Sequence, residues 1–310
     1  MSRRLIIAIA GTFLFCTSIY AQTIDDGLMI PKHTLFTGDI YTHDSWSQYW
    51  EGTLKRTNGN LGTVTTQTNT WSANYGVTNH LDIIALTPYV WTNASQGVLK
   101  GQGGLQDFTL AAKYNLIDAP FTNYGRLRII GVVSGILPLT NYTPDFQPLS
   151  LGLGSKSLSG RGTVFFQAPR GWFINGSAAY TWRSNVKLDR PYYYTNGQLY
   201  LSDEVAMPNV FNYVVSGGYL KHGWMFPILF SQQRTLGGGD IRRQDMPFIS
   251  NRMNYSKLSA MAMFPLPKLH GLMLQVMYGH ILDGRNVGYS STITTGLLYT
   301  FHLERHRSKI

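Results

Sequence analysis

The clearest pattern in the sequence is an alternation of apolar and polar residues in two neighbouring segments. In residues 107–116 every second position is apolar, and the positions between are mostly Asp, Thr, Lys and Asn. Residues 125–137 alternate in the same way, starting with Arg126 and Arg128 on the polar side. A period of two is that of a strand with one apolar and one polar face. Both segments exceed the ~5–6 residues of an ordinary strand and fit the roughly 9–11 residues of a strand that crosses a bilayer.

The same rhythm continues along the chain and predicts twelve strands. They are expected at residues 32–43, 62–77, 81–91, 104–116, 125–137, 160–168, 172–183, 209–220, 224–234, 251–264, 271–282 and 288–303. The connections alternate between short and long, as in outer-membrane barrels with short periplasmic turns. The sequence therefore predicts an all-β fold, a closed antiparallel up-and-down transmembrane β-barrel of about twelve strands whose first strand pairs with its last.

The hairpin formed by residues 107–116 and 125–137 also carries a motif. Residues 104–114 read Gly-Leu-x-Asp-x-x-Leu-x-x-Lys-Tyr, and residues 75–81 before them read Tyr-Gly-x-Thr-x-x-Leu. This combination resembles the outer-membrane barrel family named for the MetA pathway of phenol degradation, most clearly over residues 62–137. The resemblance implies a barrel with a transporter-like role, and it implies no catalytic or ligand-binding residues.

The amino terminus has the layout of a secretory signal peptide. Two arginines precede an apolar run and small residues that end at Ala21, where cleavage is expected. Cys16, the only cysteine, would leave with residues 1–21. We expect residues 22–31 to be a periplasmic segment, either outside the barrel or tucked into its lumen, residues 32–303 the barrel and residues 304–310 a basic tail. Only 14% of residues are charged, against about 25% in soluble proteins, which fits a barrel with a lipid-facing exterior.

The net charge of +10 raises the question of nucleic acid as a partner. The Lys and Arg residues are scattered over strand ends and loops, with no basic helix or aromatic-basic motif. The pattern therefore favours contacts with outer-membrane lipid and an anion-tolerant lumen, with a small-molecule solute and no nucleic acid as partner.

A cluster of charges is predicted inside the barrel. With the turn at residues 117–124, Lys113 falls opposite Arg128 and close to Asp82. Like charges directly opposed are destabilising unless an acid or an anion lies between them. The cluster is either a structural network neutralised by its acids or a constriction that selects anionic or polar solutes. Its candidate residues are Asp82, Asp107, Lys113, Arg126 and Arg128.

The first outer loop is rich in aromatic and charged residues. They are Trp46, Tyr49, Trp50, Glu51, Lys55 and Arg56. Such a set is typical of a small-molecule or glycan platform, and equally of an aromatic girdle at the membrane interface. Sequence alone leaves both interpretations open.

Four methionines share the inward alternation of two adjacent strands. They are Met261, Met263, Met273 and Met277. A flexible, polarizable lining suits hydrophobic solutes, whereas the simpler interpretation is the filling of a narrow lumen. No His or Cys joins the set, so no metal site is predicted.

Two prolines fall inside predicted strands, Pro88 and Pro227. Proline cannot donate to a strand ladder and occurs in sheets mainly at edges or bulges. Because a closed barrel has no edge, each proline is expected to mark a bulge or a kink.

No enzyme is predicted. Outer-membrane phospholipases place a His two residues before a Ser that is followed by Asn-Gly, and no His in this chain begins such a motif. Zinc motifs are also lacking, so no cofactor is expected. The sequence predicts a bacterial outer-membrane barrel for passive transport of a small hydrophobic or amphipathic solute. The alternatives are a plugged barrel that binds a partner through its outer loops and, less favoured, an outer-membrane lipid enzyme.

Overall fold

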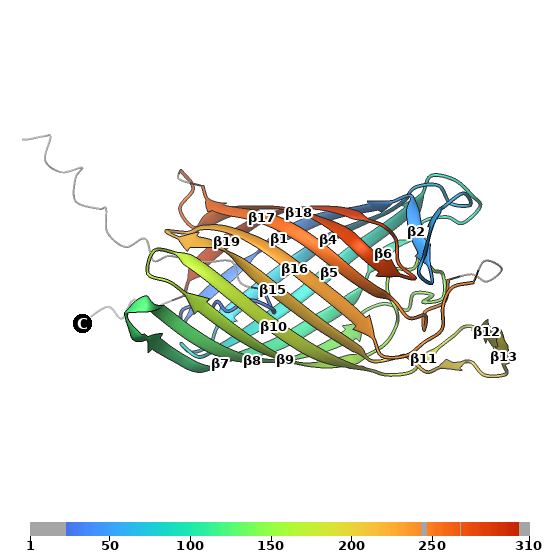
Figure 1. Ribbon diagram of the computed structural model, residues 1–310, viewed down its shortest axis with the longest axis horizontal. Coiled ribbons are helices and arrows are strands. Elements are labelled where there is room, and N and C mark those ends of the chain that lie inside the picture. The colour runs from blue at the N-terminus through green and yellow to red at the C-terminus, as the bar shows by residue number, and fades with distance from the viewer. Residues whose placement is uncertain (1–22, 243–246, 267, 304–310) are drawn as a thin grey trace, which may run out of the picture.

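The computed structural model describes residues 23–242, 247–266 and 268–303. In these residues, twelve long strands form one closed antiparallel barrel (Figure 1). The strands are β1 (Thr34–Trp46), β4 (Val64–Gly76), β5 (Leu81–Ala94), β7 (Asp107–Phe121), β8 (Gly125–Pro138), β9 (Ser157–Gln167), β10 (Trp172–Arg183), β15 (Val210–Lys221), β16 (Trp224–Thr235), β17 (Asn254–Pro265), β18 (Leu272–Arg285) and β19 (Ser291–His302). β1 pairs with β19, from Thr34 opposite His302 onward, and this pairing closes the sheet as predicted.

The two ends of the barrel differ as the loop lengths predict. The long loops carry the small strands and lie at one end, on the right in Figure 1. These strands are β2 (Gln48–Glu51), β3 (Leu54–Thr57), β6 (Gly103–Leu105), β11 (Val186–Lys187), β12 (Tyr193–Thr195), β13 (Gln198–Tyr200) and β14 (Glu204–Val205). Short turns join the strands at the other end, one of them the 3-10 turn Thr122–Tyr124. The predicted signal peptide, residues 1–21, and the basic tail, residues 304–310, lie outside the described residues.

The outer face of the barrel is an apolar band. Aliphatic side chains on most strands point outward and are about half exposed, among them Leu110, Val133, Leu158, Val164, Ile174, Val215, Ile228, Ile293 and Leu297. Large aromatic side chains are exposed at the short-turn end, including Trp172, Trp224 and Phe301. An apolar band with an aromatic rim is the surface that lipid and its headgroups require. Within the part of the chain that the structure describes, no helix is long and apolar enough to cross a membrane.

Several predicted strand ends differ from the structure by about three residues or more, and two of these differences affect the site or the first outer loop. β1 continues to Trp46, so Asp44 belongs to the barrel and not to the loop. β7 continues to Phe121 and contains a register shift between Asn115 and Ile117. The predicted turn at residues 117–124 is therefore mostly strand, because a bulge adds a residue to one strand and lets the ladder continue.

Both strand prolines interrupt the pairing on one side, which confirms a local break in the ladder, whereas the bulge or kink expected at each stays a prediction. The β5–β7 ladder stops at Leu86, and pairing resumes with β6 at Tyr89, beyond Pro88. The β16–β17 ladder is likewise interrupted at Pro227, between Met225 and Ile228. On their other sides both prolines lie in continuous ladders, so each defect is local.

Candidate functional site

Residues 23–31, the N-terminal segment, lie inside the barrel at the short-turn end. Leu28 and Ile30 are each only 2% exposed and belong to one apolar cluster. The cluster also contains Phe36, Phe165, Phe173, Leu220, Met225, Met263, Met273 and Leu298, which come from eight strands around the barrel. On the opposite wall, Ile24 and Met29 pack against a second cluster of buried side chains from β5, β7 and β8. The segment therefore fills the lumen at this level.

A glycine allows the segment to approach the wall. A Cβ at Gly27 would overlap the Cβ and ring of Phe165, at distances that real Cβ contacts never reach. Changing the Phe165 rotamer would not remove this overlap, since its Cβ is fixed by the backbone. Close seating of the segment thus depends on a residue without a side chain.

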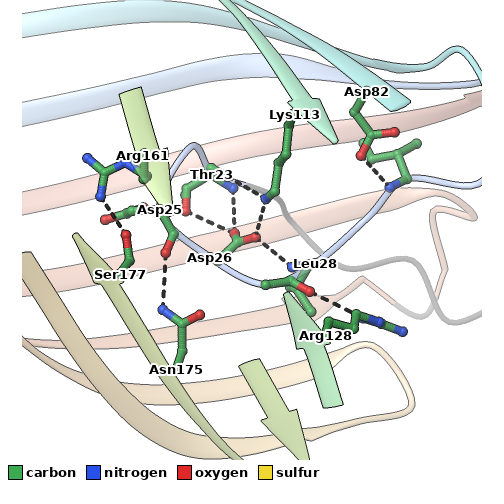
Figure 2. A network of polar contacts seen from close by, with 12 residues as sticks. Thr23, Asp25, Asp26, Leu28, Asp82, Lys113, Arg128, Arg161, Asn175 and Ser177 are labelled. Carbon is green, nitrogen blue, oxygen red and sulfur yellow. Dashed lines mark hydrogen bonds and ion pairs between the residues drawn. The ribbon is translucent and has the colours of Figure 1, made fainter. Parts of the chain in front are cut away.

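Buried charges hold the segment in place (Figure 2). Lys113 is fully buried, and its Nζ lies 2.8 Å from Asp26 Oδ1 and donates to the Thr23 carbonyl at 2.9 Å. Asp82 is also fully buried, and its Oδ2 accepts a hydrogen bond from the Ile30 amide at 3.0 Å. Lys113 and Asp82 are directly opposite each other on β7 and β5, as the sequence predicted.

The predicted opposition of Lys113 and Arg128 is wrong. Because β7 is longer and bulged, Lys113 pairs with Val132, and Arg128 pairs with Asp118. Arg128 Nε lies 3.5 Å from Asp118 Oδ2, and Arg128 Nη1 donates to the Gly27 carbonyl at 3.3 Å. The sequence interpretation missed Asp118 because the residue fell in the predicted turn.

Two other residues predicted for the charge cluster lie away from its centre. Arg126 forms an ion pair with Asp118, but its side chain is 56% exposed at the rim. Asp107 lies at the opposite end of β7, where its Oδ1 accepts a hydrogen bond from the Tyr142 hydroxyl at 2.6 Å. Burial, with the Asp107 carboxylate second, raises the pKa of Tyr142 above its usual range. Asp107 therefore does not neutralise Lys113. The sequence interpretation missed Asp26, which forms the ion pair with Lys113, and Asp118, which pairs with Arg126 and Arg128.

The methionines contribute to the apolar side of the lumen. Met263 and Met273 are 1% and 3% exposed and are part of the cluster around Leu28. Met261 packs against the same cluster, and Met277 lies opposite Met261 in the ladder. Whether these side chains contact a passing solute stays a prediction.

The six aromatic and charged residues of the first loop lie in or beside the hairpin β2–β3. Trp50 is only 6% exposed and contacts the edge of Tyr289, with ring centroids 5.4 Å apart. Lys55 Nζ lies 3.0 Å from the centroid of the Tyr289 ring. The other contacts are the ring pair Trp46–Tyr49 at 6.2 Å and the ion pair Arg56–Glu51 at 2.6 Å. These side chains mainly contact each other and Tyr289, and ligand binding at the hairpin stays a prediction.

A second ion pair fixes the outer loops near this hairpin. Arg285 Nη2 lies 2.6 Å from Asp240 Oδ2, and Asn286 donates to the other carboxylate oxygen at 2.8 Å. The hydrogen bond from Arg285 is the largest cause that lowers the pKa of Asp240 to about 2. Asn286 also accepts from the Gly52 amide, so the contact joins loops that are distant in sequence. Among the described residues, no group of three or more His, Cys, Asp or Glu side chains could hold a metal.

The closed barrel, its apolar band and its partly polar lumen define a transmembrane β-barrel of the outer-membrane type. The family model described as "Putative MetA-pathway of phenol degradation" matches residues 57–294, so the chain belongs to this family. No curated protein matches the sequence.

The comparison with solved structures found similar chains. An outer membrane channel from Pseudomonas putida F1 is 16% identical, with a TM-score of 0.71 over 88% of this chain and 97% of that chain. The translocator domain of autotransporter NalP from Neisseria meningitidis is 10% identical, with a TM-score of 0.46 over 88% and 90% of the two chains. The CymD monoaromatic hydrocarbon channel is 12% identical, with a TM-score of 0.38 over 90% of each chain. The first of these supports the barrel fold.

Proposed function

We propose that the protein is a passive outer-membrane channel for small amphipathic solutes, and that the N-terminal segment is its removable constriction. The observation that carries the proposal is the seating of this segment. Non-covalent contacts alone hold residues 23–31 in the lumen: two buried apolar side chains, one ion pair and a few hydrogen bonds. Contacts of this kind are reversible, so the lumen can alternate between filled and open states.

The lining of the lumen fits an amphipathic solute. Small polar side chains are buried on its inner face, among them Ser72, Ser134, Ser159, Thr163, Ser177, Ser216, Thr292 and Thr294. The apolar cluster around Leu28 lies on the same inner face, nearer the short turns. A solute with polar and apolar parts would find partners for both. An outer membrane channel with the same fold supports the proposal.

Asp82 would lower the free-energy cost of releasing the segment, because it faces the buried Lys113. Lys113 is buried, so loss of its ion pair with Asp26 would carry a large cost if no other carboxylate faced the cation. Asp82 is directly opposite Lys113 on the neighbouring strand. When Asp26 leaves with the segment, Asp82 still faces the Lys113 cation.

Planar-bilayer recordings test the proposal. Asp26→Asn and Leu28→Ala each weaken the seating of the segment, and we expect both to raise the open probability, as should deletion of residues 23–31. Asp203→Asn is a matched control, since it changes the same charge in a largely exposed outer-loop ion pair. If the deletion variant forms a folded barrel and conducts no better than the unaltered protein, the proposal is wrong.

A second role is favoured by the ordered outer loops. Residues 186–207 pack an apolar cluster against Phe248 and Ile249, so that part of the outer loops has a folded core of its own. Folded outer loops together with a filled lumen suit a structural barrel that binds a partner. A closed deletion variant in the recordings above would favour this role over transport.

A further inference from the structure

A cavity of about 290 Å³ lies in the lumen near the long loops. Its walls come from the outer ends of five neighbouring strands, β7, β8, β9, β10 and β15, and from the loop between β8 and β9. Ile136, Leu153 and Val210 form an apolar side, and Gln106 and Asn212 add amide groups. At ~30 Å³ per water, the volume equals about ten water molecules, which suits a solute of about ten heavy atoms.

The cavity has a cation at one end and an acid at the other. Arg183 and Asp107 both line it, on strands that are separated by β8 and β9. The Asp107 carboxylate is engaged by the Tyr142 hydroxyl. Within the described residues, the Arg183 guanidinium forms no hydrogen bond or ion pair, and only its backbone amide is bonded, to Asn209. Of the two charged groups that line this cavity, Arg183 is thus the one whose side chain lacks a partner among the described residues.

The chemistry of Arg183 selects its partner. A partly buried guanidinium pays a desolvation cost that a hydrogen-bonded anion offsets. Its planar fork matches a carboxylate, which it binds with two parallel hydrogen bonds. The apolar side of the cavity is then available for a hydrocarbon body. Asp107 at the other end disfavours a second anionic group there.

Two more arginines continue from Arg183 toward the short turns. Arg183 is opposite Ser157 on β9, and Arg161 lies four residues further along β9. Arg161 is opposite Val132 on β8, and Arg128 lies four residues further along β8. Each step is roughly 13 Å along a strand. Arg161 donates to Ser177 at 2.6 Å, while its buried Nε has no hydrogen-bond partner.

The N-terminal segment already places an acid on this path. Figure 2 shows Asp25 beside Arg161, and Asp26 binds Lys113. A solute carboxylate that moves from Arg183 to Arg161 would compete with Asp25 for the same cation. The arginines therefore connect the cavity to the constriction.

We propose that the cavity binds small carboxylates with an apolar body, with the carboxylate at Arg183, and that Arg161 and Arg128 extend the path inward. The proposal rests on the proposed channel function and names its class of solute. Benzoate is a suitable probe because it is ionised at pH 7 and has nine heavy atoms. Benzamide has the same size and shape without the charge.

Calorimetric titration of the detergent-solubilised, full-length barrel tests the proposal. We expect benzoate to bind more tightly than benzamide, and Arg183→Gln to weaken benzoate at least about tenfold, the loss of one charged hydrogen bond or more. Arg183→Lys should retain part of the affinity. Arg234→Gln is the matched control, because the Arg234 side chain is exposed and, among the described residues, bonds only Gln232. Equal binding of benzoate to the unaltered protein and Arg183→Gln overturns the proposal, and so does the absence of benzoate binding to the unaltered protein.

Conductance of the same preparations separates this proposal from the channel function. If benzoate binds through Arg183 but no variant conducts, the cavity is a binding site and the channel function is wrong. If the deletion variant conducts and Arg183→Gln changes neither benzoate affinity nor anion selectivity, the channel function stands and the carboxylate site is wrong. If Arg183→Gln fails to fold, Arg183→Lys is measured in its place. A benzoate affinity below that of the unaltered protein supports the site, and an equal affinity overturns it.

Discussion

Gly27→Ala should unseat the N-terminal segment and leave the barrel intact. The added Cβ would overlap the Cβ of Phe165, so the segment has to move away from the wall or stay out of the lumen. Overpacking of this kind costs about 1–3 kcal/mol, which shifts the equilibrium toward the released segment by roughly 5- to 150-fold. The barrel strands make their ladders independently of residue 27, so their stability should change little.

Two measurements check this prediction. Protease cleavage within residues 23–31 should speed up by a similar factor, and the open probability in planar bilayers should rise. Gly135→Ala is the matched control, since a Cβ at Gly135 on β8 meets nothing within 4 Å. If Gly27→Ala and Gly135→Ala show the same cleavage rate and the same open probability, the tight seating of the segment against Phe165 has no role in closing the lumen.

Three further predictions concern the charges and the apolar cluster. Asp82→Asn removes the acid opposite Lys113 and should lower the free energy of unfolding by about 3 kcal/mol. We expect no larger loss, because Asp26 still neutralises part of the buried charge. Unchanged denaturant midpoints and unchanged ion selectivity would count against this prediction. Met263→Ala should cost about 2–5 kcal/mol in the same unfolding experiment, since the side chain is 1% exposed, and a loss under 1 kcal/mol would mean that the cluster is loosely packed. The pKa of Asp240 is lowered to about 2 from 3.8, so its stabilisation is present above pH 4 and is lost as the pH falls toward 2. Because the side chain is 36% exposed, we expect only about 1 kcal/mol, visible as a smaller stability loss between pH 6 and pH 2 in Asp240→Asn, and equal losses would refute the assignment.

The alternation of apolar and polar side chains was sufficient to predict most of the fold. Because a strand turns its side chains by half a turn per residue, the sequence by itself divides each segment into an outward and an inward set. This division placed Asp82 and Lys113 in the lumen, and the structure buries both completely. The even number of strands also agreed with the closure between β1 and β19, since the first and last strands of an even set run antiparallel and can pair.

Register was harder to predict, because one bulge shifts every later pair. The predicted turn at residues 117–124 sets Lys113 opposite Arg128, but β7 continues to Phe121, and the shift between Asn115 and Ile117, for which the sequence carries no direct signal, changes the register by one residue. The predicted first outer loop was too long, because Asp44 and Trp46 continue β1 despite their polar and aromatic character. Period-two patterns fix which face a residue takes, but not its partner on the next strand.

The N-terminal segment shows what only the tertiary structure decides. Residues 22–31 have no periodicity, and a polar lead-in on either side of the membrane would have the same sequence pattern. Its place in the lumen follows from the contact of Gly27 with Phe165 and from the ion pair of Asp26 with Lys113. Phe165 and Lys113 lie far from the segment in the chain. The unpartnered Arg183 likewise becomes visible only when β7 to β15 surround one cavity. Local pattern thus determined the strands and their faces, whereas the contents of the lumen depend on contacts between residues distant in sequence, which no local pattern encodes.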